Sequence, residues 1–205
     1  PDPVWQQSRH LVTTSQLQET KVSMGDLRPH PPVARFLAAF SRFELALDWA
    51  RTQMVAAWGP IALESRAFEF VETTYYDVAM GTGLRKILFV FRDLVDPDML
   101  VDWKRLTNQW EEQYARENAC PEARPLNLDP CYLTLAKLIL ASTKDRDHRI
   151  YLSRGIFAEN TLFFRDRKWQ KRPWTYPDYQ REDYQEFLMQ ARDYLKQELK
   201  HNRGA

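Results

Sequence analysis

The chain has 205 residues, 44% of them hydrophobic and 13% aromatic, with 29 Lys and Arg against 28 Asp and Glu. This length predicts one domain with its own core, and a formal net charge of +1 excludes a global field that would attract nucleic acid or anionic lipid. No apolar run reaches the roughly 18 residues of a membrane span, so we expect a cytoplasmic protein that does not associate with membranes. Its two cysteines, Cys120 and Cys131, have no histidines at zinc-site spacing, and we favour reduced thiols over a disulfide.

Residues 1–32 form a segment unlike the rest of the chain. They are polar, lack helical periodicity and end in a Pro-rich break, and Met24 within them has the character of a start residue. We therefore expect 1–32 to be a mobile extension, 33–200 to be the domain and 201–205 to be a tail.

The first half of the domain has the pattern strand, helix, strand, strand, helix. Apolar runs predict strands at 33–41, 61–72 and 84–95, and helical spacing with a Gly59-Pro60 stop predicts a helix within 42–59. Residues 73–83 predict a helical turn ended by glycines. Asp96 is then a good N-cap with Pro97 at the first helical position. The apolar face of this second helix consists of Leu100, Trp103, Thr107, Trp110 and Tyr114.

The second half predicts more strands and a final helix. Residues 133–141 fit a strand or a helix equally well, and as a strand they would complete a βαββαβ unit. Residues 148–173 predict a meander of two or three strands with turns at Arg154-Gly155 and Asp166-Arg167. A helix follows from about residue 180, with an inner face of Tyr184, Phe187, Leu188, Ala191, Leu195 and Leu199. The predicted fold is therefore α+β: a ferredoxin-like βαββα(β) unit extended by a β-meander and a C-terminal helix, with a mainly antiparallel sheet.

Six stretches in order resemble one bacterial family, known as domain of unknown function 4416. They are GPIALES at 59–65, TTYYDVAMGTGL at 73–84, LVDPDMLVDWKRLTN at 94–108, LNLDPCYLTLAKLILASTKDRDHRIYL at 126–152, GIFAENTLFFR at 155–165 and PWTYPDY at 173–179. The resemblance covers about residues 33–200 and implies a small cytosolic domain with no assigned reaction. The family usually has glycine where Cys131 stands, the residue suited to a left-handed turn, and an aliphatic residue where Asn160 stands.

Some members of that family carry a GTP-binding description, which the residues here do not support. A P-loop needs GxxxxGK[ST] between a strand and a helix, so that backbone N–H groups and a lysine surround the phosphates. The nearest stretch, MGTGLRK at 80–86, has a different spacing and leads into a predicted strand.

Residues 127–152 hold the densest set of chemically active side chains. His148 would act as an acid or base near neutral pH, Lys144 and Arg149 would hold a phosphate or carboxylate, and Asp145 or Asp147 would orient the imidazole. The alternative is a charged hairpin loop in which His148 bonds to the backbone.

Two carboxylates near this stretch also allow alternatives. Asp129, before Pro130, fits a turn better than a cation-binding or proton-accepting role. For Glu159, in an apolar strand, we favour the solvent face over burial with a partner.

Aromatic and basic residues offer further candidates. Tyr75, Tyr76, Trp174, Tyr176 and Tyr179 would line a pocket for a ring, or pack the last helix onto the sheet. The basic stretch 165–172, with Trp169 for stacking, would suit RNA, although such a tip is more often surface.

We predict a domain that binds a small anionic ligand, bearing phosphate or carboxylate, near residues 127–152. An RNA-binding module and an interaction scaffold without a small ligand are the alternatives. The sequence indicates no metal site, cofactor or oligomeric state. The candidate catalytic residues are His148, Lys144 and Asp129, and the candidate ligand-binding residues are Lys137, Arg149, Lys104, Asn108, Tyr76 and Tyr176.

Overall fold

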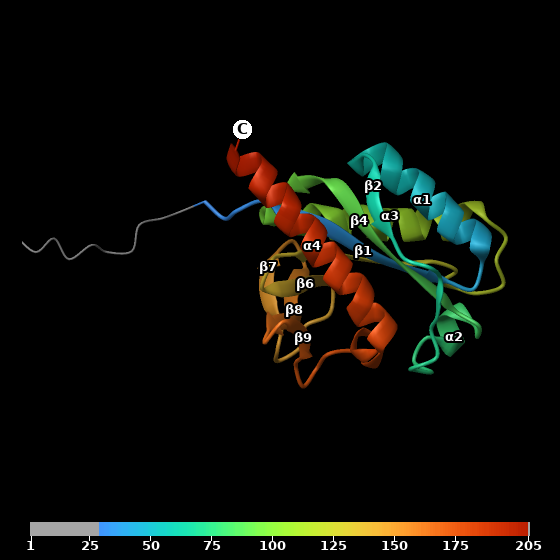
Figure 1. Ribbon diagram of the computed structural model, residues 1–205. Helices are drawn as coiled ribbons and strands as arrows, with labels where there is room; N and C mark the ends of the chain where they lie inside the picture. Colours follow the sequence, from blue (N-terminus) through green and yellow to red (C-terminus); the bar gives the residue numbers. More distant parts are fainter. Residues whose placement is uncertain (1–28, 205) are drawn as a thin grey trace, which may run out of the picture.

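The computed structural model describes residues 29–204 (Figure 1). All but the last four residues of the extension expected at 1–32, with His10 and Met24, lie outside the described residues. His30 is exposed, and its Nδ1 lies 2.6 Å from the Pro31 carbonyl oxygen.

The first half of the domain follows the predicted element order. It contains β1 (Val33–Ser41), α1 (Glu44–Trp58), β2 (Ile61–Glu64), β3 (Phe68–Glu69), α2 (Asp77–Met80), β4 (Arg85–Val95), the 3₁₀ turn η1 (Pro97–Met99) and α3 (Leu100–Glu117). The strand expected at 61–72 is two short strands, β2 and β3, which both pair with β4. Between them Ser65 Oγ accepts a hydrogen bond from the Leu88 backbone N–H. Asp96 caps η1 as predicted, because its carboxylate accepts the Asp98 N–H at 3.0 Å.

The second half contains β5 (Asn127–Leu133), β6 (Lys137–Ser142), β7 (Ile150–Ser153), β8 (Ile156–Arg165), β9 (Lys168–Lys171), the 3₁₀ turn η2 (Pro177–Gln180) and α4 (Glu182–Gly204). The ambiguous segment 133–141 is neither one strand nor a helix, because a tight turn divides it between β5 and β6. Thr134 Oγ1 closes that turn by accepting the Ala136 and Lys137 N–H groups. The predicted meander is confirmed, with left-handed backbone at Arg154, Gly155, Asp166 and Arg167.

The nine strands found in residues 29–204 form one antiparallel sheet with the order β2-β4-β1-β5-β6-β8-β7, while β3 pairs with β4 and β9 with β8. The prediction of an α+β fold with a mainly antiparallel sheet is confirmed. Since β1 and β2 are both antiparallel to β4, which lies between them, they run parallel to each other and α1 connects them across one face. The ferredoxin-like description of this part stays a prediction.

The two faces of the sheet carry separate cores. Alternate residues of β1 point to opposite faces: Leu37 and Ala39 pack with α1 and α3, whereas Phe36 and Ala38 pack with α4. Figure 1 shows α4 crossing the strands on its own, away from α1 and α3. The predicted inner faces of α3 and α4 are confirmed, since all of their named residues are buried except Leu199, which is partly buried against the α4 core.

The sheet opens between β5 and β6. Strand β5 pairs with β1 from Asn127 to Leu133, but with β6 only from Cys131 onwards. Pro130 lies where the second pairing stops, and proline has no N–H to extend a ladder. The favoured interpretation of Asp129-Pro130 as a turn is therefore wrong, because both residues lie inside a strand. Cys131 also continues β5 without left-handed backbone.

Candidate functional site

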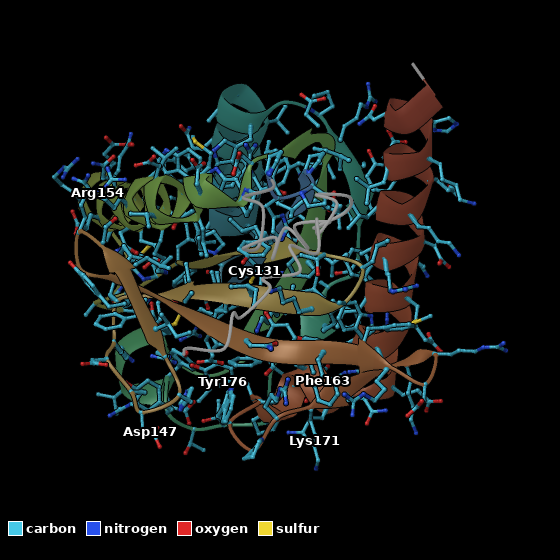
Figure 2. All side chains as sticks on the ribbon, turned by 90° about the vertical axis from the view of Figure 1, so that its left-hand side faces the viewer. Cys131, Asp147, Arg154, Phe163, Lys171 and Tyr176 are labelled. Carbon is cyan, nitrogen blue, oxygen red and sulfur yellow. The ribbon has the colours of Figure 1, made fainter. Side chains whose placement is uncertain are left out.

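A cavity of about 490 Å³ lies where β5 and β6 part. The buried Phe40 of β1 and Lys86 of β4 line it, and its walls come from five segments: 70–76, 104–108, 124–129, 140–149 and 174–179. Figure 2 shows Asp147 and Tyr176 near the same end of the sheet, with Arg154 at the far end of β7. Segments distant in the sequence therefore meet around one cavity.

The structure brings together eight of the nine predicted site residues. Those that line the cavity are Tyr76, Lys104, Asn108, Asp129, Lys144, His148, Arg149 and Tyr176. Lys137 does not, because it begins β6 at the turn closed by Thr134, and four residues of strand separate it from Ser142 at the cavity. The five aromatic candidates also line the cavity, although Tyr179 is only 2% exposed and Trp174 stacks on His148.

His148 is held by two carboxylates. Its Nδ1 lies 3.0 Å from Asp147 Oδ1 and its Nε2 lies 3.2 Å from Glu159 Oε2, while the ring stacks on Trp174 at 4.9 Å. The imidazole can donate both hydrogen bonds only when it is doubly protonated. The geometry therefore gives His148 side-chain partners in place of a backbone bond, and both ring nitrogens contact carboxylate oxygens.

Glu159 is buried, and the preference for its solvent face is wrong. Its side chain has no exposed surface because Arg149, His148 and Thr161 all contact it. Arg149 Nε donates to Glu159 at 2.8 Å and Thr161 Oγ1 at 3.1 Å. A carboxylate in this strand is tolerated because every contact supplies a donor.

Arg149 connects this wall of the cavity. Its guanidinium also donates to Ser142 Oγ at 2.8 Å, to the Lys144 carbonyl at 2.9 Å and to Tyr176 Oη at 2.9 Å. Burial alone would lower the pKa of Arg149, but the hydrogen bonds and charges of Glu159 and Tyr176 together outweigh burial, and the pKa is raised. The guanidinium therefore stays charged.

Asp129 stands on the opposite wall. Lys104 Nζ donates to Asp129 Oδ1 at 3.3 Å and to the Leu128 carbonyl at 3.0 Å, and Asn127 Nδ2 donates to Asp129 Oδ2 at 2.8 Å. Burial would raise the pKa of this carboxyl, but Lys104, Lys86 and Arg124 together lower it below its ordinary value. Asp129 is therefore an ionised acceptor at the cavity.

Sequence reasoning missed two ion pairs beside this wall, of which Lys86–Asp178 is buried and Arg124–Glu111 is partly exposed. Arg124 Nη2 lies 2.9 Å from Glu111 Oε2, and Lys86 Nζ lies 2.5 Å from Asp178 Oδ2. Burial raises the pKa of Glu111 in spite of the nearby cations. Residues 118–126 carry no motif that could have indicated Arg124. Lys86 was considered only as the lysine of a stretch that does not have the P-loop spacing.

Two exposed cations stand at the cavity mouth. Lys144 Nζ donates to Tyr75 Oη at 2.8 Å, and that hydrogen bond lowers the pKa of the Tyr75 hydroxyl. Arg146, which the sequence did not single out, also lines the cavity. Within residues 29–204, neither cation forms an ion pair with a carboxylate.

The basic stretch 165–172 lies apart from this cavity. Trp169 is only 5% exposed and packs against Phe164 in the core between the sheet and α4. Its ring therefore cannot stack on a base as the RNA alternative expected. Arg172 is engaged as well, with its guanidinium 4.0 Å from the Phe163 ring.

The fold and the cavity define a one-sheet α+β domain with a charged pocket at a split in the sheet. The family described as domain of unknown function 4416 matches residues 31–194, and the chain belongs to that family. No curated protein and no solved structure matches the chain. Across 29–204, no helix is long and apolar enough to span a membrane, and no cluster of His, Cys, Asp and Glu has the arrangement of a metal site. Cys120 and Cys131 are free thiols.

Proposed function

We propose that this domain binds a small molecule bearing a phosphate or carboxylate group, with the anionic group at the cavity mouth between Lys144 and Arg146. The charge distribution carries the proposal. Six lining side chains are Lys or Arg and three are Asp or Glu. Lys86, Lys104, Arg124 and Arg149 already face carboxylates, so the uncompensated positive charge lies at Lys144 and Arg146.

The chemistry of these two side chains suits an anion. A guanidinium can hold two oxygens of a phosphate or carboxylate side by side, and an ammonium adds a point charge. Each such charged hydrogen bond contributes about 1.5–3 kcal/mol. The volume of about 490 Å³ falls within the range of roughly 300–1,000 Å³ that small-molecule sites occupy.

The proposal assigns binding and no reaction. His148 was the candidate general base, and both of its nitrogens already contact carboxylates. The same contacts support a role in which Glu159 and His148 hold the wall that carries Arg149 and Lys144.

Thermal-shift measurements on the 205-residue protein test this function. The panel is inorganic phosphate, citrate, sugar phosphates, nucleotides and a short RNA. A ligand at 100 times its Kd adds about 2.7 kcal/mol to the free energy of unfolding, which raises the Tm of a protein of this size by about 5–11 °C.

Two variants show whether the thermal shift depends on the cations at the cavity mouth. Lys144→Ala/Arg146→Ala should abolish the shift, whereas Lys137→Ala removes a lysine at the far end of β6 and should retain it. Equal shifts in all three proteins would place binding elsewhere. No shift with any anion, together with a stable protein complex in pull-downs, would instead support the interaction scaffold.

A further inference from the structure

The cavity is electrostatically uneven from its inner end to its mouth. The buried Lys86 and Lys104 and the partly exposed Arg124 each face an acid, whereas Lys144 and Arg146 at the mouth are exposed and face none within residues 29–204. The compensated pairs are Lys86–Asp178 at 2.5 Å, Lys104–Asp129 at 3.3 Å and Arg124–Glu111 at 2.9 Å. An anion is therefore favoured at the mouth, and a neutral polar group is favoured further in.

Asp129 makes this inner part of the cavity an acceptor of hydrogen bonds. Its side chain keeps 24% of its surface exposed, and it lines the cavity. Each carboxylate oxygen already accepts one bond, from Lys104 and from Asn127. A carboxylate offers about four acceptor positions, so further positions remain for a ligand, and only for a donor.

The nearby cations decide which donor fits. A ligand ammonium at Asp129 would also meet the positive charges of Lys104, Lys86 and Arg124, which together lower the pKa of this carboxyl. A hydroxyl group is neutral, so it avoids that repulsion and still donates to an ionised acceptor.

Two further features of the walls suit a hydroxylated ligand. Asn108 lines the cavity, and its amide makes no side-chain hydrogen bond to another described residue, so it can both donate to and accept from a hydroxyl. The rings of Tyr76 and Phe70, 5.8 Å apart between centroids, give apolar surface for the C–H face of a sugar.

We infer that the ligand is a phosphorylated sugar or polyol, whose phosphate lies at Lys144 and Arg146 and whose hydroxyl groups bind Asp129 and Asn108. This inference rests on the proposed function and adds a specificity-determining residue to it. Asp129 would exclude ligands that are anionic throughout and select those with hydroxyl groups opposite the anion.

Isothermal titration calorimetry with glucose 6-phosphate, inorganic phosphate, citrate and glutamate tests the inference. The wild-type protein should bind glucose 6-phosphate at least about tenfold more tightly than inorganic phosphate. Asp129→Asn should remove most of that difference and leave the affinity for inorganic phosphate within about twofold. Asn108→Ala, which breaks no ion pair, should reduce the same difference by a smaller factor and serves if Asp129→Asn does not fold.

The other outcomes separate this inference from the proposed function. Equal affinity for inorganic phosphate and glucose 6-phosphate, or tighter binding of citrate or glutamate, would overturn the hydroxyl assignment while Lys144→Ala/Arg146→Ala still abolished binding. Loss of both affinities to the same extent in Asp129→Asn and Asn108→Ala would also overturn it. Binding of none of the four compounds would overturn the proposed function and the inference together.

Discussion

The buried carboxylate of Glu159 gives the sharpest test of the polar wall. Glu159→Gln keeps the size of the side chain but removes the charge that Arg149 Nε faces at 2.8 Å and His148 Nε2 at 3.2 Å. Removing one partner of a buried pair costs about 3–5 kcal/mol. Arg149 keeps its bonds to Ser142 and Tyr176, so we expect the lower end, about 3 kcal/mol.

Urea unfolding followed by fluorescence, with a thermal scan beside it, measures this loss. The urea midpoint should fall with an unchanged slope, and the Tm should fall by about 6–12 °C for a chain of this length. Asp147→Asn is the matched control, because Asp147 contacts the same imidazole but its side chain is 98% exposed. An exposed pair contributes little, so that variant should unfold like the wild type.

A Glu159→Gln variant as stable as Asp147→Asn would refute the reasoning. It would mean that Arg149 and His148 are solvated well enough without the carboxylate, and that burial of Glu159 does not organise the wall. Loss of stability in both variants to the same extent would contradict it too, because exposure would then not separate the two carboxylates.

Three further outcomes follow from other parts of the molecule. The folded state lowers the pKa of Asp129, so the wild type should be more stable than Asp129→Asn by a constant amount above about pH 5, and this difference should disappear as the pH falls below about 4, through the folded pKa. Urea unfolding at each pH would measure the difference, and a constant difference down to about pH 3 would contradict the prediction. Burial raises the pKa of both thiols, but Cys131 is buried and Cys120 is partly exposed. A thiol reagent at about pH 8 should therefore modify Cys120 alone in the folded protein, and mass spectrometry after proteolysis would show whether Cys131 reacts as well. Arg35 is 7% exposed, its Nη1 donates to the Trp58 carbonyl at 3.3 Å, and burial lowers its pKa to about 10. Because burial of this charge is costly, Arg35→Met should raise the free energy of unfolding by about 1 kcal/mol. A decrease in the urea midpoint would show instead that the buried guanidinium stabilises the fold.

Local signals in the sequence were enough for most of the elements. The Asp96-Pro97 cap, the apolar face of α3 and the meander turns depend on residues within a few positions of one another. The turn between β5 and β6 was missed because it contains no glycine, proline or asparagine. Thr134 closes it with a side-chain hydroxyl, and a threonine in an apolar run gives no such indication.

The site was partly predictable for a different reason. Residues 127–152 supplied both walls of the cavity, so their density of charge led to Asp129, Lys144, His148 and Arg149. The burial of Glu159 could not be predicted, because it depends on how the loop that carries His148 and Arg149 folds over β8. Lys137 was misplaced for the same reason that the turn was missed, since that turn puts it at the opposite end of β6 from Ser142.

The concentration of ion pairs follows from the opening in the sheet. Where the β5–β6 ladder stops at Pro130, backbone and side-chain polar groups lose strand partners and must find others. Apolar side chains could have filled the gap, and replacing buried ion pairs by apolar residues is often neutral or stabilising. Four cations instead face carboxylates around one cavity. Stability alone does not require such an arrangement, whereas the proposed binding of a polar ligand in a fixed orientation would use it.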